Sequence, residues 1–272
     1  MLLAADVVVA GVHADLDLVG LDDMGWKALV ANLSDIAAVG GRPCYALVTV
    51  SGPLARLDVD LLYDGLLEAA EAYGCPVVGG DLSSSPVLVV SVSVVGDGGT
   101  APAAPVLRSG ASPGDTLFVT GPLGSSAAGL QLLRAGKGTE GPDLVLAHRR
   151  PRPRLNEGAA ARVAGATAMI DVSDGLAADL RHLADASGVG VALDHVPVPI
   201  GMSRVSDDPE GLALGGGEDY ELVFSAPDPD RVETTFAELG LGKPIRFGRC
   251  TADPSERRLR DGDLPTVGWV HA

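Results

Sequence analysis

The feature that most constrains the fold is an alternation of short β-branched runs with stretches of helical period. Residues 5–12 and 43–51 are rich in β-branched side chains, and residues 85–96 have the short apolar run of a buried strand. Between them, residues 23–39 and 58–74 each place apolar side chains on one stripe of a helix. This alternation predicts an α/β unit in the first part of the chain.

A second α/β unit follows a segment of different composition. Residues 97–113 collect glycine, proline and small residues, as a connection between two compact bodies does. We therefore expect two domains, 1–104 and 105–272. The basic segment 148–154 should break any helix at its prolines. The further predicted strands are 115–120, 169–173, 189–196 and 219–226, and the further predicted helices are 124–135, 174–188 and 229–239.

Composition limits the classes of partner. Aromatic residues make up only 4% of the chain, so the core must consist mainly of alanine, valine and leucine. The formal charge of −16 repels nucleic acid and anionic membrane surfaces, although divalent cations could still bridge a small anionic substrate to acidic side chains. The three cysteines have no metal-binding spacing, and no apolar run is long enough to span a membrane. These features predict a cytoplasmic protein without nucleic-acid or membrane partners.

The common phosphate-binding motifs are absent from the sequence. There is no GxxxxGK[ST] loop and no GxGxxG after a strand. Acidic residues lie instead at the ends of predicted elements. The four motifs are Asn32-Leu33-Ser34-Asp35, Gly79-Gly80-Asp81, Asp171-Val172-Ser173-Asp174 and Gly215-Gly216-Gly217-Glu218-Asp219.

Taken singly, each motif also has a structural explanation. Asp174 would serve as a helix N-cap, although the same helix start would suit a phosphate or a metal. Gly79 and Gly80 would allow close approach to a ligand, or would form a turn with Asp81 as an Asx cap. By helical geometry Asp35 lies opposite the apolar stripe, where a solvated side chain is the simpler expectation.

The remaining candidates are equally ambiguous. His13 follows a predicted strand, and a surface residue is the default for a lone histidine. The glycines at 215–217 indicate a binding loop, although a flexible loop before an edge strand would have the same composition.

Taken together, the motifs resemble the thiamine-monophosphate kinase family in order and spacing. The NLSDIAA and GGGEDYEL motifs separate this family from the related aminoimidazole ribonucleotide synthetase, selenophosphate synthetase and hydrogenase-maturation proteins. The segments that carry the resemblance are Asn32–Ala38, Gly79–Asp81, Arg108–Gly110 with Pro113–Asp115, Val119–Gly121, Asp171–Gly175 and Gly216–Leu222.

The resemblance implies an α/β (α+β) fold of two domains, similar to aminoimidazole ribonucleotide synthetase. The N-terminal sheets of two subunits would pair into a barrel, giving a homodimer with ATP in clefts along its interface. The implied reaction moves the γ-phosphoryl group of ATP directly onto thiamine monophosphate, giving thiamine diphosphate and ADP. No side-chain base is expected, since the attacking phosphate oxygen is already ionised.

The resemblance also implies site residues, by position in the motifs. Several Mg²⁺ ions would be bound by Asp6, Asp35, Asp81, Asp171 and Asp174. ATP would contact Tyr73, Gly80, Arg108 and Ser173. Thiamine monophosphate would contact His13, Glu218 and Trp269, with Glu218 facing the thiamine cation and Trp269 stacking on it.

Some positions depart from the family pattern. The family normally carries an upstream Gly-Asp-Asp motif, and Ala5, Ala10 and Leu82 stand where the family has oxygen-bearing side chains. We therefore expect weak binding of ATP·Mg²⁺. Two alternatives remain: a catalytically impaired or truncated family member acting as a nucleotide-binding dimer, and a superfamily relative with a different substrate.

Overall fold

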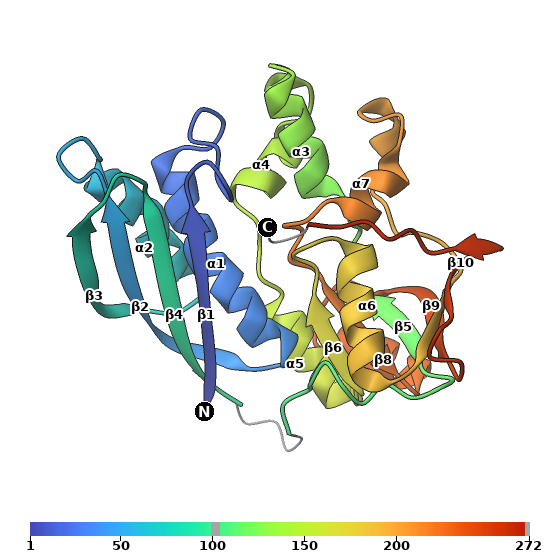
Figure 1. Cartoon of the computed structure of the whole chain (residues 1–272). Helices are drawn as coiled ribbons and strands as arrows, with labels where there is room; N and C mark the ends of the chain where they lie inside the picture. The colour runs from blue at the N-terminus through green and yellow to red at the C-terminus, as the bar shows by residue number, and fades with distance from the viewer. Residues whose placement is uncertain (99–103, 270–272) are drawn as a thin grey trace.

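The computed structural model describes residues 1–98 and 104–269, which form a mixed α/β fold around two sheets (Figure 1). Within the described residues, the first sheet has the strand order β1-β4-β2-β3. Its elements are β1 (Leu2–Val9), α1 (Leu21–Ala38), β2 (Arg42–Gly52), α2 (Val59–Ala72), β3 (Val77–Ser84) and β4 (Val89–Asp97). These elements confirm the predicted strands and helices of the first unit, with ends shifted by a few residues.

Side-chain alternation gives the first sheet one packed and one open face. Val48 of β2 and Val92 of β4 are fully buried in the core that the sheet forms with α1 and α2. The residues that alternate with these buried ones along each strand point to the opposite face, where strand pairing aligns them across β1, β4 and β2. The large apolar side chains exposed on that open face are Leu3, Val7, Tyr45 and Leu47.

The Gly79-Gly80-Asp81 segment lies inside β3. Strand β3 runs parallel to β2, and Asp81 pairs with Thr49. The predicted Asx turn is therefore wrong, because pairing with β2 uses the backbone that a turn would have redirected. A Cβ atom on Gly80 would lie 1.7 Å from the carbonyl oxygen of Val48, so the neighbouring strand itself requires glycine.

The second sheet has the strand order β11-β10-β7-β9-β5-β8-β6 within the described residues. Its elements are β5 (Thr116–Val119), α3 (Ser125–Arg134), η1 (Gly138–Glu140), α4 (Pro142–Arg149), α5 (Leu155–Ala164), β6 (Ala168–Asp171), α6 (Leu176–Ser187), β7 (Gly190–Leu193), η2 (Met202–Arg204), α7 (Pro209–Gly215), β8 (Leu222–Ala226), α8 (Pro229–Glu238), β9 (Ile245–Thr251), β10 (Arg257–Leu259) and β11 (Gly262–Asp263). The predicted boundary between 104 and 105 stays a prediction, and residues 99–103 lie outside the described residues.

A core lies on each face of the second sheet. On one face, Phe224 stacks on Phe118 with ring centroids 5.2 Å apart and on Phe236 of α8 at 6.1 Å. On the other face, Leu117 and Val223 pack in the cluster that includes α6. The sheet is thus covered by helices on both sides, which matches the predicted α/β character.

Helix α1 is buried on almost every side, because β1, α2, α4, α5 and β6 all contact it. Its last turn even enters the core of the second domain, where Ala37 and Ala38 cluster with Phe118. The expectation that Asp35 lies on a solvated face is therefore wrong. The side of α1 opposite its apolar stripe packs toward the second domain, and Asp35 is partly buried there.

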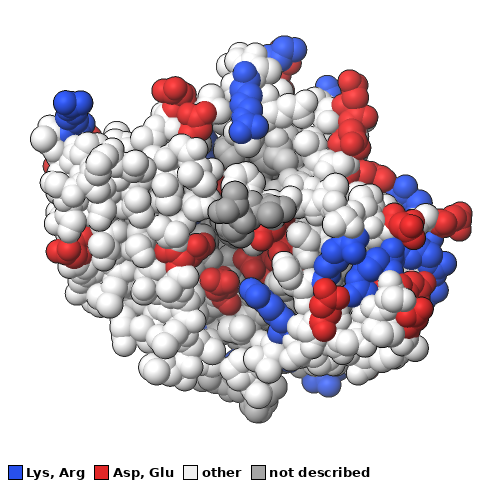
Figure 2. Space-filling model, in the orientation of Figure 1, with Lys and Arg blue, Asp and Glu red and all other residues white. Residues whose placement is uncertain are grey.

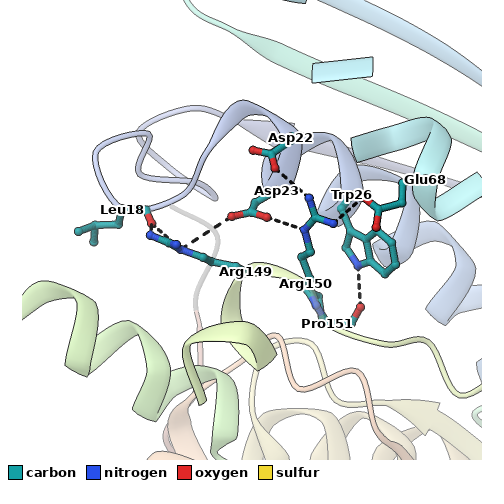
Figure 3. A network of polar contacts seen from close by, with 8 residues as sticks. All are labelled: Leu18, Asp22, Asp23, Trp26, Glu68, Arg149, Arg150 and Pro151. Carbon is teal, nitrogen blue, oxygen red and sulfur yellow. Dashed lines mark hydrogen bonds and ion pairs between the residues drawn. The ribbon is translucent and has the colours of Figure 1, made fainter. Parts of the chain in front are cut away.

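The proline-containing segment 148–154 breaks the helix as predicted and ties the two domains together (Figure 3). The guanidinium of Arg150 lies 5.4 Å from the ring centroid of Trp26, and Trp26 Nε1 donates a hydrogen bond of 2.8 Å to the Pro151 carbonyl. Arg149 donates to the Leu18 carbonyl. The acidic partners of Arg150 are Asp22 at 2.8 Å, Asp23 at 2.7 Å and Glu68 at 2.6 Å.

No helix among the described residues is long and apolar enough to cross a membrane.

Candidate active site

Three predicted metal ligands come together where the two domains meet. The pKa of Asp35 is raised to about 7, mainly by burial and also by the charges of Asp171 and Asp6, while the charge of Arg108 opposes the shift. We call Asp6, Asp35 and Asp171 the aspartate cluster. Interactions between charges weaken with distance, so these carboxylates lie near one another, and Figure 2 shows acidic side chains in the hollow between the two halves of the molecule. A cation or a protonated ligand would relieve the repulsion in this cluster.

Asp171 is fixed by a buried contact between the domains. Ser34 Oγ of α1 donates a hydrogen bond of 2.6 Å to Asp171 Oδ2 at the end of β6. Burial raises the pKa of Asp171, while the Ser34 hydrogen bond and the Arg108 charge lower it. Arg108 therefore lies close to both Asp35 and Asp171, as a residue binding the same phosphate groups would.

Asp174 is not the N-cap of α6. Gly175 takes that position, and the helix begins at Leu176. The backbone N–H groups of Ser173 and Asp174 donate instead to Oδ2 of Asp179, at 3.1 and 3.0 Å. The pKa of Asp179 is raised to about 8, mainly by burial and also by the charge of Asp171. The N-cap prediction is wrong because Gly175, with a positive φ of 108° and no side chain that could accept a hydrogen bond, occupies the cap position.

Asp81 does not join the aspartate cluster of its own chain. Strand pairing places Asp6 in one row across the sheet with Val92, Val48 and Gly80. The side chains of this row point to the face that carries the helices. Asp81 follows Gly80 and therefore points to the open face, on the opposite edge strand of the sheet. Three strand spacings of about 4.8 Å separate the two edges, or roughly 14 Å. The side chain of Asp81 accepts a hydrogen bond of 3.0 Å from Ser83 Oγ.

The glycine-rich loop packs directly against Ser173. A Cβ atom on Gly217 would lie 2.1 Å from the Ser173 carbonyl oxygen, so this close approach requires glycine. The next residues, Glu218 and Tyr220, have positive φ angles of 66° and 50°. Strand β8 consequently starts only at Leu222, later than predicted. Glu218 and Tyr220 thus have strained backbone conformations, and the loop leads into a central strand, not the edge strand of the alternative explanation.

Two acidic residues that follow Glu218 hold the loop to the second domain. Asp219 accepts hydrogen bonds from the backbone N–H groups of Gly124 at 2.6 Å and Ser126 at 3.1 Å, at the start of α3. Burial raises the pKa of Asp219 to about 7. Glu221 is buried and accepts from Thr120 Oγ1 at 2.5 Å and Arg154 Nε at 2.9 Å.

The remaining predicted residues occupy separate places. Trp269 is half exposed, and its backbone N–H donates to the Asp174 carbonyl at 2.9 Å, so it lies beside the site. His13 sits in the turn after β1, where its Nδ1 accepts from Val9 N at 3.1 Å. Tyr73 lines a pocket of about 680 Å³ between α1, α2 and residues 150–157, and its ring lies edge-on to Trp26.

Magnesium suits the chemistry of the aspartate cluster. Among the described residues, no three acidic, histidine or cysteine side chains converge closely enough to hold a metal ion by themselves. Magnesium does not need such a cage, since it keeps several waters and is commonly bound through one or two carboxylates plus substrate phosphates. Asp35 and Asp171, with mutual repulsion that a cation would relieve, fit that pattern.

Comparison with known proteins places the chain in a family. The model of the AIR synthase related protein N-terminal domain matches residues 1–97, and that of the C-terminal domain matches residues 112–259. The thiamine-monophosphate kinase of Salmonella typhimurium is 38% identical over 98% of this chain and 84% of that protein. The thiamine-monophosphate kinase of Mycobacterium tuberculosis is 41% identical over 98% of this chain and 79% of that protein. This chain belongs to the thiamine-monophosphate kinase family.

Solved structures support membership of the kinase family. The thiamine-monophosphate kinase of Stenotrophomonas maltophilia matches with a TM-score of 0.86 at 33% identity, over 97% of this chain and 86% of that chain. AaThiL complexed with AMPPCP and TMP matches with a TM-score of 0.87 at 34% identity, over 99% of this chain and 86% of that chain. The hydrogenase maturation protein HypE matches with a TM-score of 0.72 at 21% identity, and this likeness shows only that the two proteins share a fold.

The sequence analysis missed residues that support the site. Lys27 of α1 contacts Glu218, Ser34 holds Asp171, and Asp179 fixes the backbone at Ser173. Ser34 lies within the NLSD motif, so its position beside Asp35 was the available signal. Lys27 and Asp179 carry no such signal, because a single charged residue on a predicted helix is usually solvated.

Proposed function

We propose that this chain is a kinase that transfers the γ-phosphoryl group of ATP onto thiamine monophosphate, giving thiamine diphosphate and ADP. The observation that carries the proposal is the 36–41% identity to thiamine-monophosphate kinases over 98% of the chain. The complex of AaThiL with TMP and AMPPCP, a non-hydrolysable ATP analogue, supports both substrates. The non-catalytic dimer is not favoured, since Asp35, Asp171 and Arg108 still converge on one site.

The chemistry needs positioning and charge neutralisation more than a base. A phosphate oxygen of thiamine monophosphate would attack the γ-phosphorus, and the bond to the β,γ-bridging oxygen would break. Bound magnesium would neutralise the phosphates and the aspartate cluster. Arg108 would bind phosphate oxygens with its planar guanidinium. Asp179 would keep the backbone of Ser173 and Asp174 in place without touching the substrates.

Two of the predicted substrate residues, Glu218 and Trp269, lie next to the segment that carries Ser173 and Asp174. Glu218 N donates to the Ser173 carbonyl at 2.9 Å, and Trp269 N donates to the Asp174 carbonyl at 2.9 Å. A thiamine cation held between Glu218 and Trp269 would therefore place its phosphate near Asp174. Attraction of the cation to the carboxylate and to the indole face would supply specificity.

The proposal includes a homodimer, in which the open face of the first sheet is covered by a second copy. The exposed apolar side chains there, Leu3, Val7, Tyr45 and Leu47, favour such burial. A partner would also account for Asp81, which lies roughly 14 Å from Asp6 in its own chain. We infer that Asp81 serves the site of the second copy. The unbridged cysteines among the described residues favour a cytoplasmic setting.

The first test is formation of thiamine diphosphate from ATP and thiamine monophosphate, followed by chromatography. Turnover should be measurable for the wild-type chain and should fall about 100-fold or more in Asp35→Asn and Asp171→Asn. Arg246→Met, far from the site, is the control for purification and folding. Absence of the diphosphate product from a folded wild-type protein with excess Mg²⁺ would reject the kinase assignment.

Mixed dimers test the role of Asp81. Asp35→Asn and Asp81→Asn should each keep about 1% of wild-type activity or less alone. If the two residues act on one site from different copies, random mixing should restore about a quarter of wild-type activity, since half of the dimers would be mixed and would keep one intact site. No recovery after denaturation and joint refolding would show that Asp81 does not act across the subunits.

A further inference from the structure

A buried lysine from the first domain reaches the substrate loop of the second. The side chain of Lys27 in α1 is 2% exposed, and its Nζ lies 2.6 Å from Oε1 of Glu218. The angle of this contact leaves the ammonium group without a well-formed hydrogen bond. A buried ammonium group depends on a paired carboxylate, so Lys27 and Glu218 constrain each other strongly.

The loop around Glu218 needs such a constraint. Positive φ angles of 66° at Glu218 and 50° at Tyr220 are unfavourable for residues that carry a Cβ atom. A segment in this conformation persists only where its surroundings hold it. Backbone hydrogen bonds to Ser173 and Val172 hold its main chain, and Lys27 is the contact that holds the Glu218 side chain from the other domain.

The second oxygen of Glu218 faces a neutral neighbour. His148 Nδ1 lies 3.5 Å from Oε2 of Glu218 and 3.1 Å from Ser126 Oγ. The pKa of His148 is lowered to about 3, mainly by burial and also by the charge of Lys27, so the ring is uncharged at neutral pH. Lys27 therefore neutralises Oε1, while Oε2 keeps negative character that an organic cation can use.

We propose that Lys27 is a positioning residue for thiamine monophosphate, which acts through Glu218. By tying one carboxylate oxygen to α1, it orients the other toward the cationic substrate and couples the substrate loop to the helix that carries Asp35. This inference rests on the proposed function in assigning Glu218 to the substrate. It predicts a defect in binding of the cation, with ATP binding and the chemical step preserved.

Steady-state kinetics of Lys27→Met and Lys27→Gln test the inference. The KM for thiamine monophosphate should rise about tenfold, while kcat and the KM for ATP stay within about threefold. Lys243→Met is the matched control, because Lys243 pairs with Glu233 at 2.8 Å on an exposed surface. The control should leave all three constants unchanged. An equal loss in kcat, or a rise in the KM for ATP, would overturn the inference.

A double-mutant cycle separates action through Glu218 from a general effect. In a Glu218→Gln background, adding Lys27→Met should raise the KM for thiamine monophosphate less than twofold further. A full tenfold rise in that background would show that Lys27 acts independently of Glu218. If Lys27→Met does not fold, Lys27→Gln, which keeps an amide donor, carries the same cycle.

Hydrogen exchange provides a readout that does not require catalysis. In the substrate-free protein, amides of residues 216–221 should exchange about tenfold faster in Lys27→Met than in wild type, whereas Lys243→Met should not change them. Unchanged exchange would overturn the inference even if the enzyme is active. If the wild-type protein lacks kinase activity but exchange is still faster in Lys27→Met, the result would support the role of Lys27 in positioning the loop and would reject the proposed function.

Discussion

Replacement of Arg150 by methionine should weaken the contact between the domains by an amount that can be worked from its partners. Methionine keeps most of the apolar stem and removes the charge. The contact with Asp23, whose side chain is 12% exposed, should contribute about 1.5–3 kcal/mol, as for a charge-assisted hydrogen bond. The pairs with Asp22 and Glu68 are more exposed and should add about 0.2–1 kcal/mol together. With about 0.5 kcal/mol from Trp26, the total is about 2–4.5 kcal/mol.

Urea unfolding followed by two probes measures this effect. In a Trp269→Phe background, Trp26 is the only remaining tryptophan and reports on the junction of the domains. Its fluorescence transition should move to lower urea in Arg150→Met, ahead of the far-UV circular dichroism transition if the domains separate first. Arg246→Met is the matched control, since Arg246 pairs with Glu233 and Asp230 within one domain, and it should cost less than about 1 kcal/mol. Equal small losses in both variants would refute the reasoning.

Other predictions concern acid stability, packing and metal dependence. Burial lowers the pKa of His148 from 6.5 to about 3, so the unfolded chain takes up a proton first as pH falls. Relative to His148→Gln, wild type should lose about 1.4 kcal/mol per pH unit between about pH 6 and pH 4, measured by urea titration. Phe224→Ala, which breaks a three-ring stack, should cost about 3–5 kcal/mol by thermal and urea unfolding. EDTA should abolish turnover, and Asp35→Asn should raise the Mg²⁺ concentration for half-maximal rate about tenfold.

Sequence patterns predicted helices and strands well where the buried side chains recur with the period of the helix or strand. The stripe on residues 23–39 and the β-branched run at 43–51 correspond to α1 and β2 almost to the residue. Prolines correctly placed the break between α4 and α5. The strands β3, β9, β10 and β11 were missed, since pairing with neighbouring strands supplies most of their stability and leaves little local signal.

The site required information that periodicity does not contain. Helical geometry placed Asp35 on a solvated face, because it cannot show that a second domain packs against that face. The pattern around Asp174 suggested an N-cap, whereas Gly175 takes that position and the Asp179 carboxylate accepts from the backbone just before the helix. The family resemblance identified the aspartates jointly, but the sheet register alone revealed that Asp81 and Asp6 lie on opposite faces.

The burial of α1 between both cores limits how far the two family modules can be treated as separate pieces. A fragment ending at residue 97 would keep its own sheet and yet expose Ala37 and Ala38, which pack with Phe118 in the other module. It would also leave the Lys27 ammonium without its carboxylate. Recombination between homologues at the linker would join α1 of one parent to the second module of another, so such chimaeras should be less stable than either parent unless the residues that pack against α1 match.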